Sequence, residues 1–134
     1  MIILDAGVII GFRDADDAHH GAATTFLLAH AGEQLGMSTI TKAETLVNPV
    51  RVGRLDEALE ILRTLMIEEV RLDENSAVAL ASLRVTSGLK MPDCCVVLAA
   101  LQRAAAIASF DQRLCDIASS SFGLVVYPQD HAVR

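Results

Sequence analysis

The chain begins with the stretch MIILD, residues 1–5, in which four apolar residues lead directly to a carboxylate. A short apolar run rich in Ile and Leu is typical of a buried β-strand. The stretch AAIASFD, residues 105–111, repeats the arrangement, with an acid two residues after an apolar run. In open α/β sheets, ligands bind at the carboxyl ends of the strands. The two stretches therefore predict acidic side chains at a functional edge of a sheet.

Apolar runs and helical periodicity alternate along the rest of the chain. Strands are predicted at residues 1–4, 34–38, 67–72, 105–109 and 124–127. Helices are predicted at residues 22–31, 41–47, 55–66, 74–87, 92–103 and 112–119. We expect Asn48-Pro49 to stop or bend the second of these helices, because proline lacks the N–H that a helix interior needs. Such alternation predicts an α/β protein, a three-layer α/β/α sandwich with a mostly parallel central sheet, in a single domain over residues 1–134.

The composition fits one globular domain and limits how it meets its partners. Of 134 residues, 52% are hydrophobic and 21% charged, which provides a real core and excludes a disordered chain. The net charge of −6 means that the overall field does not attract nucleic acid. A polyanionic ligand would require metal ions or a local basic rim. A basic partner for the acidic block at residues 14–17 is the alternative.

The cysteines and the apolar start indicate a cytoplasmic protein with no membrane association. The chain has an odd number of cysteines, three in all, and their spacing is not that of zinc ligands. We therefore interpret Cys94, Cys95 and Cys115 as reduced core thiols. The apolar start is interrupted by Asp5 and has no basic region before it, unlike a signal peptide. No window reaches the roughly 18 apolar residues of a membrane span.

Four acids occupy equivalent places in the predicted topology: Asp5, Glu44, Asp93 and Asp111. Each also has a purely structural explanation. Asp5 can cap the turn after its strand, and Glu44 fits a capping box that starts at Thr41. Asp93 can favour a helix dipole, and Asp111 can be the N-cap of the helix at residues 112–119. These explanations treat the acids separately and do not explain why all four are predicted at one edge.

A cluster of four carboxylates requires compensation for its charge. Two carboxylates about 4 Å apart repel by roughly 4 kcal/mol at an effective dielectric constant near 20. Mg²⁺ and Mn²⁺ supply that compensation and prefer oxygen ligands. An all-carboxylate site without His or Cys is typical of phosphodiester chemistry. The four acids therefore predict a divalent-metal site through which an acidic protein meets a phosphate.

Four segments, taken together in this order, resemble PIN-domain proteins, and in particular the VapC-type toxins of prokaryotic toxin–antitoxin pairs. The segments are MIILDAGVII (1–10), TKAETLVNPVRVGRL (41–55), LRVTSGLKMPDCCVVLAA (83–100) and ASFDQRL (108–114). The resemblance implies a small α/β/α fold and a Mg²⁺- or Mn²⁺-dependent endoribonuclease. Its acidic quartet maps onto Asp5, Glu44, Asp93 and Asp111, as catalytic and metal-binding residues. Ser109 matches the family's hydroxyl residue and is expected to hydrogen-bond a carboxylate or a bound water.

The resemblance also has a departure and some open assignments. The two residues after the first acid are often hydroxyl or amide types in the family, whereas here they are Ala6 and Gly7. Asp116 is expected to be a solvated surface residue rather than a fifth acid. Surface exposure or a helix start is likewise expected of the two neighbouring histidines, His19 and His20. The candidates for phosphate contacts, with ordinary surface arginine as the alternative for each, are Arg51, Arg54 and Arg113.

The partners follow from the resemblance: an RNA substrate and a cognate antitoxin that inserts a basic side chain at the acids. The apolar faces of residues 55–66 and of the first helices are candidate surfaces for the antitoxin or for a homodimer. A phosphatase of the haloacid-dehalogenase type is disfavoured, because it needs an Asp where this chain has Gly7. A receiver-type phospho-acceptor domain is also disfavoured, because this chain lacks the paired acids and the strand-end Lys that such a domain needs. The remaining alternative is a non-catalytic PIN-fold interaction module.

Overall fold

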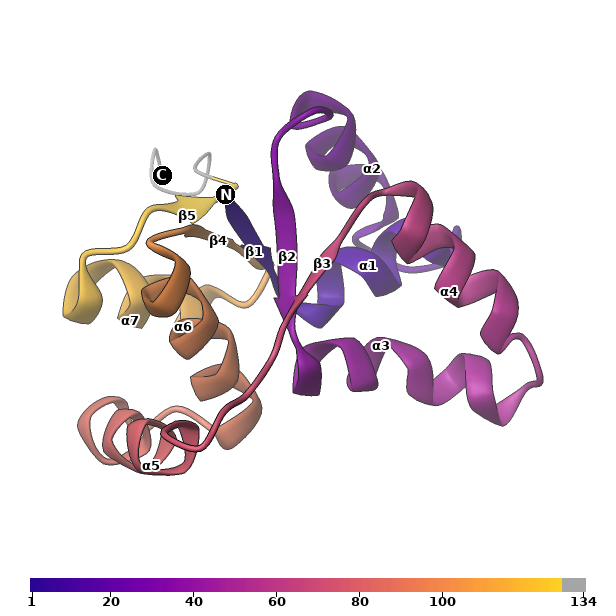
Figure 1. Cartoon of the computed structure of the whole chain (residues 1–134). Coiled ribbons are helices and arrows are strands. Elements are labelled where there is room, and N and C mark those ends of the chain that lie inside the picture. Colours follow the sequence, from indigo (N-terminus) through magenta and orange to yellow (C-terminus); the bar gives the residue numbers. More distant parts are fainter. Residues whose placement is uncertain (129–134) are drawn as a thin grey trace.

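Five short strands form the centre of the protein in the computed structural model, which describes residues 1–128 (Figure 1). The strands are β1 (Ile2–Leu4), β2 (Leu35–Ser38), β3 (Glu68–Val70), β4 (Ala106–Ala108) and β5 (Val126–Tyr127). Their order across the sheet is β3-β2-β1-β4-β5, and all four pairings are parallel. The predicted mostly parallel sheet is thus confirmed, and in this part of the chain it is wholly parallel.

Seven helices surround the sheet within the described residues. They are α1 (Ala6–Arg13), α2 (His20–Ala29), α3 (Thr39–Arg51), α4 (Leu55–Thr64), α5 (Ser76–Ser87), α6 (Met91–Arg103) and α7 (Gln112–Phe122). Helices α5, α6 and α7 lie on one side of the sheet, and α1, α2 and α4 lie on the other (Figure 1). The predicted three-layer α/β/α sandwich is confirmed. The predicted domain of residues 1–134 extends into residues 129–134, which lie outside the described residues.

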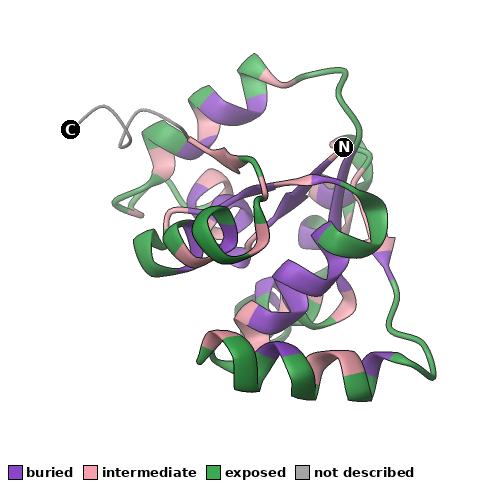
Figure 2. Ribbon diagram, turned by 90° about the vertical axis from the view of Figure 1, so that its left-hand side faces the viewer, coloured by how far each residue is buried: buried purple, intermediate pink, exposed green. Residues whose placement is uncertain are grey.

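Both faces of the central strand are covered, which explains its continuous apolar sequence. Ile3 belongs to the core beneath α5, α6 and α7, whereas Ile2 and Leu4 belong to the core beneath α1, α2 and α4. Successive side chains of a strand point to opposite faces, so a doubly covered strand needs apolar residues at every position. Buried residues concentrate on the strands and on α6, where the seven residues from Cys94 to Ala100 are all buried (Figure 2). The interpretation of Cys94 and Cys95 as core residues is confirmed.

Two helices differ from the predicted pattern. No helix was predicted between residues 5 and 21, yet Ala6–Arg13 forms helix α1. Its helical start depends on Asp5, whose side chain accepts a hydrogen bond from the main-chain N–H of Ala6 at 2.8 Å. The expected stop at Asn48-Pro49 is also wrong, because α3 continues through Pro49 to Arg51.

Proline is tolerated in α3 because it lies in the last turn of the helix. Pro49 precedes the end at Arg51 by two residues, and its ring is buried. Its carbonyl accepts a hydrogen bond from the N–H of Arg54 at 2.8 Å, in the turn that leads to α4. A proline near the C-terminus of a helix removes a single intrahelical hydrogen bond, and the helix ends before further turns could be distorted.

Candidate functional site

Asp5 lies at the carboxyl edge of the sheet, where β1 ends and α1 begins. The main-chain N–H of Asp5 donates to the carbonyl of Ala108 at 2.9 Å, which places this acid beside the end of β4. Oδ1 accepts from the N–H of Ala6, and Oδ2 accepts from the hydroxyl of Ser109 at 2.7 Å. The expected capping role of Asp5 is therefore present. Its carboxylate is also held by Ser109, which lies 104 positions away in the sequence.

Ser109 joins Asp5 to Asp111. The Ser109 side chain is fully buried, and its oxygen accepts a hydrogen bond from the N–H of Asp111 at 3.0 Å while its hydroxyl donates to Asp5. Asp111 is the N-cap of α7, and its Oδ1 accepts from the N–H of Leu114 at 3.1 Å. The expected hydrogen bond between Ser109 and a carboxylate is present. The N-cap role of Asp111 is present as well, and it leaves the other carboxylate oxygen available for a ligand.

Glu44 projects from the second turn of α3 and is exposed. The N-cap of α3 is Ser38 rather than Thr41, so Thr41 is a buried residue inside the helix. The capping-box explanation for Glu44 is therefore wrong. No helix-capping role remains for the Glu44 carboxylate, which strengthens the case for a functional one.

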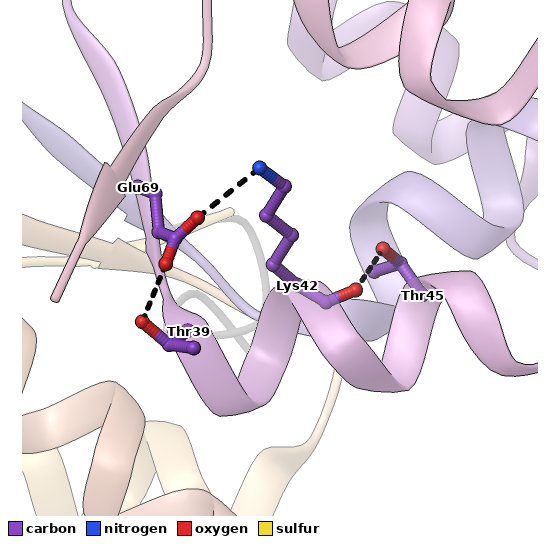
Figure 3. A network of polar contacts seen from close by, with 4 residues as sticks. All are labelled: Thr39, Lys42, Thr45 and Glu69. Atoms are coloured by element: carbon purple, nitrogen blue, oxygen red, sulfur yellow. Dashed lines mark hydrogen bonds and ion pairs between the residues drawn. The ribbon is translucent and has the colours of Figure 1, made fainter. Parts of the chain in front are cut away.

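The start of α3 is anchored to the neighbouring strand β3 (Figure 3). Oε2 of Glu69 accepts from the hydroxyl of Thr39 at 2.7 Å, and Oε1 accepts from Nζ of Lys42 at 3.2 Å. Thr45 contributes within the helix by donating from its hydroxyl to the carbonyl of Lys42 at 2.7 Å. These contacts fix the first turn of α3 and thereby the direction from which Glu44 approaches the other acids.

Asp93 lies in the first turn of α6, directly after Pro92, which is well placed at a helix start. Burial, Asp5 and Asp111 all raise the pKa of Asp93, whereas Lys90 and Arg113 lower it. Burial, Asp5 and Asp93 likewise raise the pKa of Glu44. The four predicted acids are therefore close enough to repel one another, although they come from four separate segments.

Burial is the main cause of the raised pKa of Asp5, and its proximity to Asp111 adds to the effect. The hydrogen bonds from Ser109 and Ala6 act in the opposite direction and favour the ionised form. The neighbouring thiol of Cys115 has its pKa raised to about 11 by burial and by the Asp111 and Asp5 carboxylates. A thiol with that pKa stays protonated at neutral pH and supplies neither a nucleophile nor a metal ligand. The reactive groups at this edge are carboxylates.

The donor set fits a hard divalent cation that keeps much of its water. All four acids offer oxygen, which Mg²⁺ and Mn²⁺ prefer. Within residues 1–128, no three side chains of Asp, Glu, His or Cys are close enough to bind one ion together. Mg²⁺ usually binds through one or two carboxylates and retains several water molecules. The spacing therefore suits an ion with few direct protein ligands.

Basic groups flank the acids on two sides, and two of them were missed by sequence reasoning. Lys90 and Arg113 lie close enough to Asp93 to lower its pKa, and Nη2 of Arg113 donates to the carbonyl of Gly88 at 3.3 Å. Arg13, at the end of α1, lines a cavity together with Glu44. Arg113 was a sequence candidate. Lys90 directly precedes Met91-Pro92-Asp93, so its proximity to Asp93 could have been predicted from the sequence.

The remaining candidates are exposed side chains. Arg51 is exposed at the end of α3, and Arg54 lies 3.8 Å from Glu57 in an exposed ion pair. Asp116 is exposed on α7 and accepts a hydrogen bond from Gln112, as expected of a solvated residue.

The two histidines lie at the start of α2, as expected. Nδ1 of His20 is 2.9 Å from the carbonyl of Gly11. The ring of His19 is exposed and stacks on Phe110 at 4.6 Å between ring centroids.

The fold and the site together define an α/β protein with a carboxylate cluster at the carboxyl edge of a parallel sheet. The profile of the PIN domain matches residues 2–119, and the chain belongs to this family. A comparison with curated proteins gives no match. No helix among residues 1–128 is long and apolar enough to cross a membrane.

Solved structures share this fold at low sequence identity. A toxin–antitoxin complex from Klebsiella pneumoniae is 18% identical with a TM-score of 0.75, over 93% of this chain and 96% of that one. VapC20 of Mycobacterium tuberculosis, described as a Sarcin-Ricin loop cleaving toxin, is 17% identical with a TM-score of 0.74, over 93% and 97%. FitAcB from Neisseria gonorrhoeae is 25% identical with a TM-score of 0.69, over 98% and 99%.

Proposed function

We propose that this protein is a divalent-metal-dependent endoribonuclease that acts as the toxin of a toxin–antitoxin pair. The observation that carries the proposal is the convergence of four acids from separate segments at one edge, where burial and the neighbouring acids raise the pKa values of Asp5, Glu44 and Asp93. Membership of the PIN domain family supports it, as does the likeness of the fold to a toxin described as cleaving RNA. The cytoplasmic location expected from the sequence is part of the proposal.

In this proposal Mg²⁺ or Mn²⁺ would bind directly to one or two carboxylates and through water molecules to the others, the four being Asp5, Glu44, Asp93 and Asp111. A bound divalent ion lowers the pKa of water and neutralises charge on the phosphate. Ser109 fixes the orientation of Asp5 through its hydrogen bond, so that one carboxylate oxygen has a constant direction. Glu44, exposed and without a capping role, is free to turn towards an ion or a bound water. No side chain is assigned as a nucleophile, because the nearby thiol of Cys115 stays protonated.

The partner in this proposal is an antitoxin, and several exposed apolar side chains offer it a surface. Met66 is 83% exposed just after α4, and Leu55 is 36% exposed at its start. The exposed face of α3 carries Ile40, Val47 and Val50, which suits either the antitoxin or a second copy of the chain. Structures that contain FitAB and VapBC2 with DNA support an antitoxin partner for proteins of this fold. Light scattering of the purified chain, alone and after coexpression with its antitoxin, tests both assemblies.

The alternative is a non-catalytic PIN-fold module, and one specific observation favours it. Ala6 and Gly7 replace the polar residues usual after the first acid, and a Cβ built at Gly7 meets no atom within 4 Å. Neither residue therefore offers a polar side-chain atom that could hold a bound water in place.

The deciding experiment is RNA cleavage with Mg²⁺ or Mn²⁺ by the wild type and by Asp93→Asn. Asp116→Asn is the matched control, because Asp116 is an exposed acid of α7 without a place in the quartet. We expect cleavage by the wild type and by Asp116→Asn, and none by Asp93→Asn or in EDTA. Cleavage that persists in Asp93→Asn and EDTA would reject the proposal. Absence of metal binding by the wild type would favour the non-catalytic module.

A further inference from the structure

A cavity of about 480 Å³ opens beside Glu44, lined by residues of helices α1, α3 and α4. Its floor is apolar and is formed by Ile10, Pro49, Val52, Ala58 and Ile61. Its polar lining consists of Arg13, Asp14, Glu44, Asn48, Arg54 and Glu57. Glu44 belongs to both the cavity and the acidic site. One unit of a polymer could therefore bind in the cavity while the next unit reaches the acids.

Arg13 supplies the cavity with a cation suited to a phosphate. Burial lowers the pKa of Arg13 and Asp14 raises it, but arginine remains charged at any physiological pH. Within residues 1–128, Arg13 forms no ion pair shorter than 4.0 Å, whereas the other arginine of the cavity, Arg54, has Glu57 beside it. A partly buried guanidinium that forms no ion pair gains from an anionic ligand, because its five N–H donors match phosphate oxygens, although the charge of Asp14 offsets part of this gain.

Asn48 supplies the cavity with an amide that can recognise a base. It follows Glu44 by four residues on α3, so the two side chains lie on the same face of the helix. Asn48 is exposed, and its side chain makes no hydrogen bond with the described residues. An amide offers both donors and an acceptor, which is the pattern that base edges require. Apolar contacts on the floor complement the face of an unstacked base.

We propose that this cavity binds one unpaired nucleotide of the RNA, next to the bond that is cut. Arg13 contacts its phosphate, Asn48 contacts the edge of its base, and the apolar floor covers the base face. The inference rests on the proposed nuclease function and assigns to it a nucleotide preference next to the cut. Such a pocket recognises sequence through splayed-out bases, as is usual for single-stranded RNA.

The charges in the cavity favour a nucleotide over a protein partner. The antitoxin expected from the resemblance brings a basic side chain to the acids, and the guanidinium of Arg13 would repel it. The phosphate of a nucleotide would instead pair with Arg13, while its base would reach Asn48.

The test compares Arg13→Gln and Asn48→Ala with the wild type on single-stranded RNA that carries a randomised tract. Sequencing of the product ends gives the nucleotide preference at each position around the cut. We expect Asn48→Ala to reduce the preference at one flanking position about tenfold, since a paired hydrogen bond to a base is lost. We expect Arg13→Gln to raise KM about tenfold with little change in kcat.

Arg63→Gln is the matched control, because Arg63 lies on α4 in an exposed pair with Glu60 and does not line the cavity. Mn²⁺ affinity and thermal unfolding should be the same in all three variants, which separates the cavity from the metal site and from folding. If the wild type cleaves RNA and neither variant changes KM or preference, the inference is overturned. The same holds if both variants cleave normally and instead weaken binding of a basic antitoxin peptide.

Anisotropy of a labelled single-stranded RNA in EDTA keeps the inference separate from the nuclease proposal. The wild type could fail to cleave RNA and still bind it about tenfold more tightly than Arg13→Gln does. That result would support nucleotide binding in the cavity and reject the nuclease proposal. Equal or absent binding in EDTA, by a protein that does not cleave, would reject both.

Discussion

The hydroxyl of Ser109 donates to Oδ2 of Asp5 and accepts from the N–H of Asp111, so one buried atom orients two acids. We predict that Ser109→Ala lowers Mn²⁺ affinity or RNA cleavage by about 10–100-fold, the usual effect of losing a group that orients a metal ligand. Titration calorimetry with Mn²⁺ and cleavage rates measure the two effects. Ser120→Ala, which removes an exposed hydroxyl of α7, should change neither. Unchanged metal binding and cleavage in Ser109→Ala would show that main-chain contacts alone position Asp5.

Ala104, at the C-cap of α6, has φ +49° and ψ +45°, a left-handed conformation that disfavours side chains. We predict that Ala104→Gly increases the free energy of unfolding by about 1 kcal/mol, because glycine adopts this conformation without strain. Urea unfolding at neutral pH measures the change. Ala81→Gly, at an exposed interior position of α5, should act in the opposite sense by about 1 kcal/mol. Destabilisation by both substitutions would mean that the Ala104 methyl contributes packing that outweighs the strain.

At the scale of the element, α3 is held in place by Glu69 of β3. Its carboxylate accepts from Thr39 and Lys42, and these hydrogen bonds hold the pKa of Glu69 below its ordinary value (Figure 3). A carboxylate with a lowered folded-state pKa stabilises the protein above its unfolded pKa, and the stabilisation is lost as the pH falls through the folded pKa. The contact therefore acts at neutral pH and disappears in acid.

We predict that Glu69→Gln lowers the free energy of unfolding by about 0.5–1 kcal/mol at pH 7, the range for a partly exposed ion pair. The difference from wild type should shrink towards zero as the pH falls below the ordinary range of a carboxylate. Urea unfolding across pH 3–8 measures it. A difference that stays constant with pH would show that the ionised form of Glu69 is not what holds α3.

The two helices that differ from prediction show which information a local pattern lacks. Helix α1 is short and apolar on most sides because α2, α3 and the sheet surround it, and a segment without a polar face has no helical period to detect. Pro49 was read as a helix break, yet its carbonyl and buried ring serve the turn into α4. In both cases a tertiary contact decides the conformation, and one segment alone does not reveal it.

The acids of the site were predictable, whereas the cavity beside them was not. Asp5 and Asp111 follow apolar strands, so a parallel topology places them at one edge, and the structure brings them close together. No sequence pattern predicts that Arg13 lines the cavity, because its place there depends on how α1 lies relative to α3 and α4. A single arginine at the end of an unassigned apolar segment looks like any surface residue. Strand ends can be read from a sequence, but the spaces between helices depend on packing.

At the scale of the whole molecule, the acid cluster opposes folding when no metal is bound. The pKa values of Asp5, Glu44 and Asp93 are raised in the folded state, chiefly by burial and also by the neighbouring acids. The folded chain therefore binds protons more tightly than the unfolded chain does. Stability of the metal-free protein falls as the pH rises from the ordinary carboxylate range through the raised values.

A divalent ion should reverse this penalty at neutral pH and have little effect in acid. At a concentration 100 times its Kd, an ion that binds only the folded state adds about 2.7 kcal/mol, which raises Tm by roughly 10 °C for a chain of this size. We predict such a shift with Mn²⁺ at pH 7.5, and almost none near pH 4, where protons compete for the carboxylates. Scanning calorimetry in EDTA and in Mn²⁺ measures it.

Asp93→Asn separates the cause of the penalty from the effect of the ion. Removing one charge of the cluster should raise Tm in EDTA at pH 7.5 above that of the wild type, and it should reduce the Mn²⁺ shift at the same time. Asp116→Asn removes a charge from the exposed face of α7 and should leave the Mn²⁺ shift intact. A full Mn²⁺ shift in Asp93→Asn would place the ion elsewhere. A lower Tm in EDTA would mean that the ionised Asp93 stabilises the start of α6 through the helix dipole more than its acidic neighbours destabilise it.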